Sequence, residues 1–153
     1  LLDAAGFKLG NFKDIGFKLI ANKLTSGMAT RFTPIQLINK SVKNCYGNPA
    51  LVNDDLVERY HNLLLRKGNR KGFAKILQSQ VASSDLTEKI GQVSQPTLII
   101  WGDQDRIIDL KNAHLFNQHI KHSELKIYEG VGHVPMEEIP EETALLTKEF
   151  LLK

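Results

Sequence analysis

Two glycine-containing turns in the last third of the sequence present side chains that can act as an acid and a base. The first follows the apolar residues 97–101 and presents Asp105 shortly after Gly102. The second is the Gly-Val-Gly-His stretch of residues 130–133, which presents His133. An imidazole whose Nδ1 is held by a carboxylate has the tautomer in which Nε2 can take a proton from a hydroxyl. The two turns therefore predict the acid and the base of a catalytic triad.

Each of these turns follows a predicted strand. Residues 97–101 form a continuous apolar run, as expected for a strand buried on both faces, and residues 124–128 form the next strand. A helix is expected at 110–120 between them. Strands that alternate with helices predict an α/β fold with a parallel sheet and flanking helices. Ligands of such sheets bind beyond the carboxyl ends of the strands, so Asp105 and His133 are expected side by side.

The chain before Pro96 has a helical pattern. Helices are predicted after Thr33-Pro34 and after Asn53, where a capping residue precedes apolar positions at helical spacing. Two strands do not make a stable parallel sheet, and the apolar residues 1–2 are predicted to be the end of a third. We therefore expect residues 1–7 to end a core strand, residues 8–94 to form a helical cap, and residues 95–153 to carry the rest of the core.

The two turns resemble those of a known family. Residues 95–105, Gln-Pro-Thr-Leu-Ile-Ile-Trp-Gly-Asp-Gln-Asp, resemble the acid-bearing strand of α/β-hydrolases, whose pattern is Pro-Thr, four apolar residues, Gly, two variable residues and Asp. Residues 130–140 resemble the family's histidine loop, including the later Glu and Pro that Glu138 and Pro140 match. Residues 1–7 are similar to the strand end before the lid. The layout is closest to the esterase and monoacylglycerol-lipase branch.

This resemblance implies the C-terminal part of an α/β-hydrolase, preceded by a helical lid, with Asp105 as catalytic acid and His133 as catalytic base. Family members carry their nucleophile in a Gly-x-Ser-x-Gly turn upstream of the point where this chain begins. None of the serines has that glycine bracket, so the chain alone is expected to be inactive. The serines are Ser26, Ser41, Ser79, Ser83, Ser84, Ser94 and Ser123.

Several functions are compatible with this layout. The first is a serine esterase or lipase whose substrate is a small-molecule or lipid-like carboxylic ester. The same fold could instead carry an epoxide hydrolase, a dehalogenase, a carbon–carbon hydrolase or an acyltransferase, depending on the nucleophile and pocket. A non-catalytic fragment or binding module is a further alternative. The Asp-x-Asp of residues 103–105 also occurs in haloacid-dehalogenase-type phosphatases, but Trp101-Gly102 before it fits that pattern poorly.

Composition and histidine spacing give expectations about cofactors and partners. No cofactor or metal is predicted, because the remaining histidines show no clean ligand spacing. Lys and Arg number 20 against 17 Asp and Glu and are scattered, so nucleic acid is not an expected partner. No apolar run is long enough to span a membrane. The single cysteine, Cys45, fits a reducing compartment such as the cytoplasm. Any targeting segment is expected upstream, and the chain is expected to associate with a missing N-terminal half or with itself.

Smaller expectations concern the neighbours of the two turns. Gly102, Gly130 and Gly132 are expected to let the chain turn sharply. Asp103 is expected in an exposed loop, with Arg106 pairing with Asp103 or Glu138. Five apolar residues could either line an acyl pocket or pack the lid against the core: Phe7, Phe12, Phe17, Met28 and Phe32.

Overall fold

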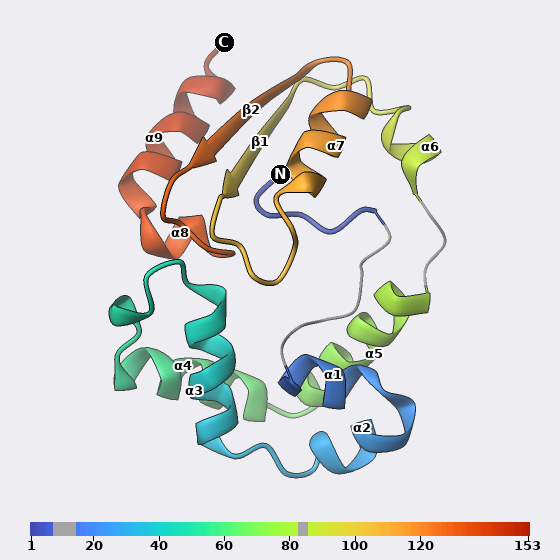
Figure 1. Ribbon diagram of the computed structural model, residues 1–153, viewed down its shortest axis with the longest axis vertical. Helices are drawn as coiled ribbons and strands as arrows, with labels where there is room; N and C mark the ends of the chain where they lie inside the picture. The colour runs from blue at the N-terminus through green and yellow to red at the C-terminus, as the bar shows by residue number, and fades with distance from the viewer. Residues whose placement is uncertain (8–14, 83–85) are drawn as a thin grey trace. The chain divides into compact units, whose positions relative to one another are not determined.

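The computed structural model describes residues 1–7, 15–82 and 86–153 and divides the chain into two compact units (Figure 1). The sheet unit consists of Leu1–Phe7, Cys45–Asn48 and Asp85–Lys153. The helical unit consists of Lys8–Asn44 and Pro49–Ser84. Residues 45–48 and 85–94, which the sequence analysis placed in a continuous cap, therefore group with the sheet.

The sheet unit is built on two parallel strands, β1 (Thr97–Gly102) and β2 (Ser123–Tyr128). Thr97 pairs with Ser123 at one end, and Gly102 pairs with Tyr128 at the other. On the opposite side of β1, Leu2 forms a parallel bridge with Ile100, as predicted for the end of a third strand. The residues of β1 are buried from Leu98 onward, as expected for a strand covered on both faces. The parallel pairing and this burial confirm the α/β class predicted from the apolar run.

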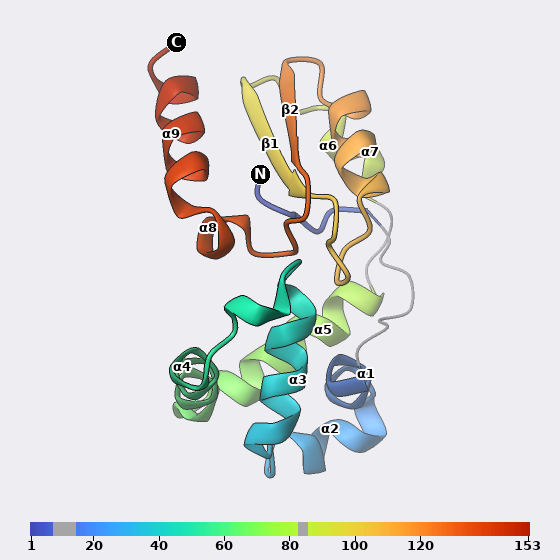
Figure 2. The ribbon, with the colours of Figure 1, turned by 60° about the vertical axis from the view of Figure 1, so that its left-hand side comes forward.

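Helices cover both faces of this small sheet (Figure 2). One face carries α6 (Thr87–Ile90) and α7 (Lys111–His119), and the other carries α9 (Pro140–Leu151), which follows the short α8 (Pro135–Glu138). Pro at the first position of α9 and two glutamates in its first turn suit a helix N-terminus. Just before α7, the Asp109 side chain accepts a hydrogen bond from the Lys111 N–H at 2.9 Å.

The core of the sheet unit lies on β1. Ile99, Ile100 and Trp101 have almost no exposed surface. The Trp101 ring lies 6.3 Å from the ring of Phe116 on α7, and its Nε1–H donates to the Ile108 carbonyl at 3.3 Å. A buried indole therefore has both an apolar neighbour and a hydrogen-bond partner, as a stable core requires. This packing fixes the end of β1, from which the candidate acid loop departs.

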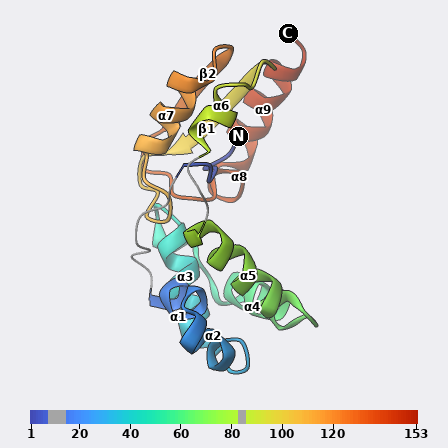
Figure 3. The same ribbon diagram turned by 90° about the vertical axis from the view of Figure 1, so that its right-hand side faces the viewer.

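The helical unit is a small bundle of its own (Figure 3). Its described elements are α1 (Ile15–Ala21), α2 (Lys23–Ala29), α3 (Ile35–Cys45, whose last residue groups with the sheet unit), a 3-10 turn (Pro49–Leu51), α4 (Asp54–Leu65) and α5 (Asn69–Ala82). Asn53 caps α4 as predicted, because its side-chain oxygen accepts from the Leu56 N–H at 2.9 Å. Ile20, Ala74 and Leu77 form one of its buried apolar clusters. None of the helices in the described ranges combines the length and apolar character needed to cross a bilayer.

Candidate active site

The structure brings the two predicted site residues together. His133 Nδ1 lies 2.9 Å from Asp105 Oδ2, within hydrogen-bonding distance. Asp105 stands in the loop after β1, and His133 stands in the loop after β2. The Asp105 side chain is fully buried, whereas that of His133 keeps 24% of its surface exposed. The carboxylate is therefore shielded from water while the imidazole can still reach a reacting group.

The orientation of Asp105 is set by its own loop. Its Oδ1 accepts hydrogen bonds from the backbone N–H groups of Ile107 at 2.7 Å and Ile108 at 2.9 Å. The other oxygen is left for the imidazole. With Nδ1 engaged by the carboxylate, the neutral ring carries its acceptor lone pair on Nε2. The pair can thus hold a proton at Nε2 and stabilise the imidazolium that results.

A short segment, which we call the strap (residues Cys45–Asn48), braces both loops within the sheet unit. The His133 N–H donates to the Cys45 carbonyl at 2.7 Å. Arg106 Nη1–H donates to the Tyr46 carbonyl at 2.9 Å, so Arg106 reaches the strap and not the carboxylates that the sequence suggested. The strap therefore supports both loops: it binds the backbone of His133 in one and the side chain of Arg106 in the other.

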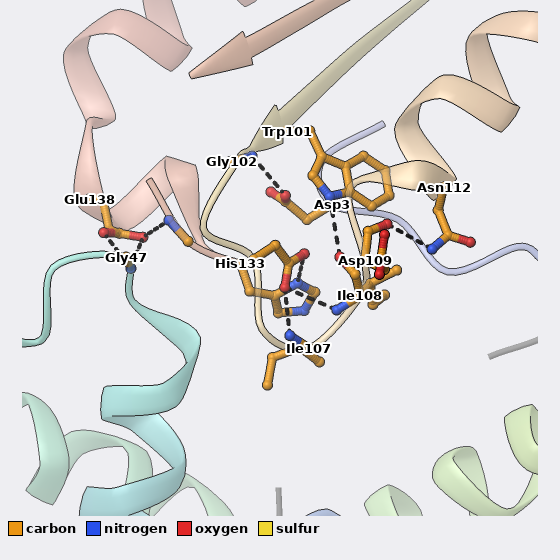
Figure 4. Close-up of polar contacts among 12 residues, drawn as sticks. Asp3, Gly47, Trp101, Gly102, Ile107, Ile108, Asp109, Asn112, His133 and Glu138 are labelled. Carbon is orange, nitrogen blue, oxygen red and sulfur yellow. Dashed lines mark hydrogen bonds and ion pairs between the residues drawn. The ribbon is translucent and has the colours of Figure 1, made fainter. Parts of the chain in front are cut away.

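Glu138 ties the strap to the residue before His133. Its carboxylate accepts from the backbone N–H groups of Gly132 at 2.6 Å, of Gly47 at 3.0 Å and of Asn48 at 3.3 Å. Figure 4 shows the contact between Glu138 and Gly47, with His133 nearby. Hydrogen bonds to an ionised carboxylate are stronger than those between neutral groups. Glu138, which the sequence analysis noted as a match to the family pattern and as a partner for Arg106, is thus a structural support of the histidine loop.

Two of the three loop glycines are required by close approach of backbone segments. A Cβ on Gly102 would collide with the carbonyl oxygens of Val131 and Gly132, and one on Gly132 would collide with the strap backbone. Only Gly130 adopts a positive φ, of 75°, which side-chain-bearing residues rarely adopt. The sequence analysis expected Gly102, Gly130 and Gly132 all to allow sharp turns, but only Gly130 has a backbone conformation that favours glycine.

Asp103 also has a role that its predicted position in an exposed loop did not suggest. Its side chain is half-buried, and Oδ1 accepts from the Gly130 N–H at 2.8 Å. Its own N–H donates to the Tyr128 carbonyl at 3.0 Å. Asp103 therefore links the beginnings of the two loops that end in Asp105 and His133.

A third ionisable side chain, which the sequence analysis did not select, lies beside the pair. One carboxylate oxygen of Asp3, one of Asp105 and a ring nitrogen of His133 all lie within 4.8 Å of one another. Asp3 is only 3% exposed. Groups of these types can bind metal ions, but the oxygens of Asp105 already face three nitrogen atoms of the protein. One feature of the sequence could have indicated Asp3 as a site residue. It directly follows the predicted strand end at residues 1–2, just as the loop that carries Asp105 follows β1.

The remaining candidate residues lie elsewhere. His61 Nε2 is 3.1 Å from the Thr33 carbonyl in the helical unit, while His114 and His119 are on α7 and His122 lies between α7 and β2. Cys45 is half-buried at the end of α3. Ser83 and Ser84 lie outside the described residues. Ser26, Ser41 and Ser79 lie on helices, Ser94 precedes β1 and Ser123 begins β2.

The apolar residues that could line an acyl pocket lie in different parts of the structure. The Phe7 ring packs edge-on against Phe116 at 4.8 Å between centroids, so it belongs to the core of the sheet unit. Met28 and Phe32 are largely exposed in the helical unit. Phe12 and the side chain of Phe17 lie outside the described residues.

Comparison with known proteins agrees with this architecture. Residues 14–140 match the model of a family described as the alpha/beta hydrolase fold. The chain is 39% identical to "Lipase 1" of Psychrobacter immobilis over an alignment of 85 residues. This alignment covers 54% of this chain and 26% of that lipase. Over 82 residues the chain is 35% identical to monoacylglycerol lipase ABHD6 of Rattus norvegicus, covering 54% of this chain and 24% of that enzyme. The matched stretch is thus about a quarter of the length of either relative.

Other similarities extend over nearly the whole chain. A 2-hydroxy-6-oxononadienedioate/2-hydroxy-6-oxononatrienedioate hydrolase of Paraburkholderia xenovorans is 25% identical over 97% of this chain and 57% of its own length. Among solved structures, a meta-cleavage product hydrolase of Pseudomonas fluorescens aligns with 99% of this chain and 54% of its own, with a TM-score of 0.76 and 22% identity. The chain therefore spans about half the length of these two proteins.

Proposed function

This chain belongs to the α/β-hydrolase fold family, and on that premise we propose that it carries the acid and base of a serine hydrolase that cleaves carboxylic esters. The observation that supports the proposal most directly is the 2.9 Å contact between His133 Nδ1 and Asp105 Oδ2, at the carboxyl ends of adjacent parallel strands. The lipases among its relatives are the source of the ester assignment.

In the proposed mechanism, a serine outside these 153 residues attacks the ester carbonyl. His133 Nε2 accepts the serine proton and then delivers it to the leaving alkoxide. Asp105 holds the ring in the required tautomer and stabilises the positive charge that forms on it. In the second half of the reaction, His133 takes a proton from the water that attacks the acyl-enzyme and then gives it to the departing serine oxygen, which releases the acid and restores the serine hydroxyl. The chain without that serine is expected to be inactive.

We assign the helical unit to the lid of this enzyme. Family resemblance motivates the assignment, and the buried apolar cluster of Ile20, Ala74 and Leu77 within this unit is consistent with it. The exposed apolar side chains of Met28 and Phe32 would suit contact with an acyl chain or a lipid-like substrate.

Hydrolysis of a carbon–carbon bond is the second candidate. A protein named as a 2-hydroxy-6-oxononadienedioate/2-hydroxy-6-oxononatrienedioate hydrolase matches over 97% of this chain in sequence, whereas the sequence matches to "Lipase 1" and "Lipase 3" cover 54% and 82% of it. The same acid and base could serve either reaction, because both need a proton carried to and from the substrate. Substrate preference therefore separates the two candidates.

The test uses the gene product in which these residues occur, assayed with p-nitrophenyl esters of two to sixteen carbons and with a 2-hydroxy-6-oxo-dienoate. We expect ester turnover, and a loss of roughly 10³-fold or more in kcat/KM for His133→Ala. The matched control is His114→Ala, which removes an exposed histidine of α7 and should leave turnover unchanged. Wild-type activity in His133→Ala would overturn the site assignment. Turnover of the dienoate alone would favour the second candidate.

A further inference from the structure

Asp3 is held in an unusual position at the edge of the sheet. The residue before it, Leu2, bridges to Ile100, and the Asp3 N–H donates to the Ile100 carbonyl at 3.1 Å. Asp3 has a φ of 39°, the only positive φ among the described residues other than glycine. Such conformations cost energy and collect at functional sites, although aspartate tolerates them better than most residues. The backbone thus turns Asp3 inward at the carboxyl end of β1.

The carboxylate of Asp3 is poorly compensated for its burial. Oδ1 accepts from the Gly102 N–H at 3.1 Å, a contact drawn in Figure 4. Within the described ranges, Oδ2 is buried and has no hydrogen-bond partner. An ionised carboxylate usually recruits more donors than one backbone amide when it leaves water. A protonated Asp3 would instead offer an O–H that could donate.

The surroundings of Asp3 oppose its ionisation. Burial is the main cause that raises its pKa to about 7, and the nearby charges of Asp105 and Glu138 act in the same direction. The Gly102 N–H and the charge of His133 lower its pKa. The groups that face it therefore come from the loop after β1, the loop after β2 and α8, and they include both members of the candidate acid–base pair.

We propose that Asp3 is a positioning residue of this site, an ionisable third group whose protonation state is coupled to the Asp105–His133 pair. The proposal stands on the 4.8 Å cluster of the three side chains, on the enclosure of Asp3 and on its unpaired oxygen. Protonated Asp3 adds no charge to the pair. Ionised Asp3 adds a negative charge that favours the imidazolium form of His133 over the neutral ring. The site thus changes its electrostatic character when Asp3 loses its proton.

A role for this coupling in catalysis rests on the proposed function. The coupling itself can be measured without a substrate. The carboxyl carbons of aspartate are labelled with ¹³C in the purified chain, and their shifts are followed from pH 3 to pH 9. Asp3→Asn identifies the Asp3 signal by its disappearance. Asp109→Asn is the matched control, because Asp109 also accepts a backbone N–H but is exposed. We expect Asp3 to titrate near pH 7, far above its ordinary value of 3.8.

Two further variants separate coupling from simple burial. In His133→Ala the midpoint of the Asp3 titration should rise by about 0.5 to 1 pH unit, because the charge that favours its ionisation is lost. In Asp105→Asn it should fall, because a repelling charge is removed. Wild-type His133 ring signals should also show a step at the Asp3 midpoint. An Asp3 that titrates near pH 4, or one that titrates high but responds to neither variant, would overturn the proposal. Neither result would depend on ester turnover, so this failure is distinguishable from failure of the proposed function.

Discussion

The carboxylate of Glu138 accepts a hydrogen bond from the backbone N–H of Gly132 at 2.6 Å, and Gly132 directly precedes His133. The same carboxylate holds Gly47 and Asn48 of the strap. One side chain thus fixes the histidine loop to a segment that lies about ninety residues away in the sequence. The position of the imidazole depends on this link as well as on its contact with Asp105.

Replacing Glu138 with Gln should therefore destabilise the chain by about 1–3 kcal/mol. The glutamine keeps the size of the side chain, but it loses the charge and turns an NH₂ group toward backbone N–H donors. Urea denaturation measures the change. Glu141→Gln is the control, because Glu141 is exposed in the first turn of α9. Equal stability of the two variants would show that Glu138 does not support the loop.

Gly102 gives a second prediction, which concerns the close approach of two loops. A Cβ at this position would meet the carbonyl oxygens of Val131 and Gly132, neither of which can move without shifting the histidine loop. Gly102→Ala should cost about 2–4 kcal/mol in the free energy of unfolding. Gly72→Ala should have the opposite sign and stabilise by about 0.5–1 kcal/mol, because Gly72 lies inside α5 with open space around it. A harmless Gly102→Ala would contradict the backbone contact.

The raised pKa of Asp3 predicts how stability depends on pH. Between its ordinary value of 3.8 and about 7, the folded state holds a proton on Asp3 that the unfolded state releases. The contribution of Asp3 to stability is therefore fully present below pH 3.8 and is lost as the pH rises through about 7. Asp3→Asn cannot ionise, so it should gain stability relative to the wild type on moving from pH 4 to pH 8.

Thermal melts of the wild type and Asp3→Asn at several pH values measure this difference. The expected change in relative stability is on the order of a few kcal/mol, since one pKa unit corresponds to about 1.4 kcal/mol. Asp109→Asn again serves as the control and should show no comparable trend. A stability difference between Asp3→Asn and the wild type that does not change with pH would contradict the raised pKa.

An apolar groove of about 620 Å³ beside Leu2 and α9 gives a prediction about association. Leu151 and Leu152 belong to its lining and are largely exposed. We expect the purified chain to form dimers or larger species through this surface, in line with the association that its sequence suggests. Light scattering after size exclusion should show that Leu152→Glu shifts the chain toward monomer. Leu24→Glu changes a still more exposed leucine in the helical unit and should not. A wild-type monomer would contradict this expectation.

The sequence predicted the parts of the site that local pattern determines. An apolar run ending at a glycine indicated β1, and strand–helix alternation indicated that β2 would lie beside it. Since parallel strands end at the same edge, the sequence alone predicts that Asp105 and His133 lie close together. The helices α3 and α4 followed from capping residues and apolar spacing. In contrast, α1 and α2 went unpredicted, and α2 contains Thr, Ser and Gly, which are weak helix formers.

The sequence could not reveal the contacts that join distant segments. Asp3 became part of the site only because Leu2 bridges to Ile100, and a two-residue strand end has no periodicity that would fix its register. The role of the strap could not be predicted either. It depends on the backbone carbonyl of Cys45 and the backbone N–H of Gly47, which nearly every sequence has at these positions. Asp103 was placed in an exposed loop because nothing local shows that Gly130 returns to meet it.

The strap also limits how the helical unit of this protein could be replaced. Residues Cys45–Asn48 group with the sheet unit although helical-unit segments precede and follow them, so the chain passes between the units more than once in each direction. Deleting or exchanging the helical unit as a single cassette would remove the carbonyl that receives the His133 N–H and the amides that bind Glu138. A chimera that borrows helices from a relative would have to be spliced as two inserts on either side of a retained tetrapeptide.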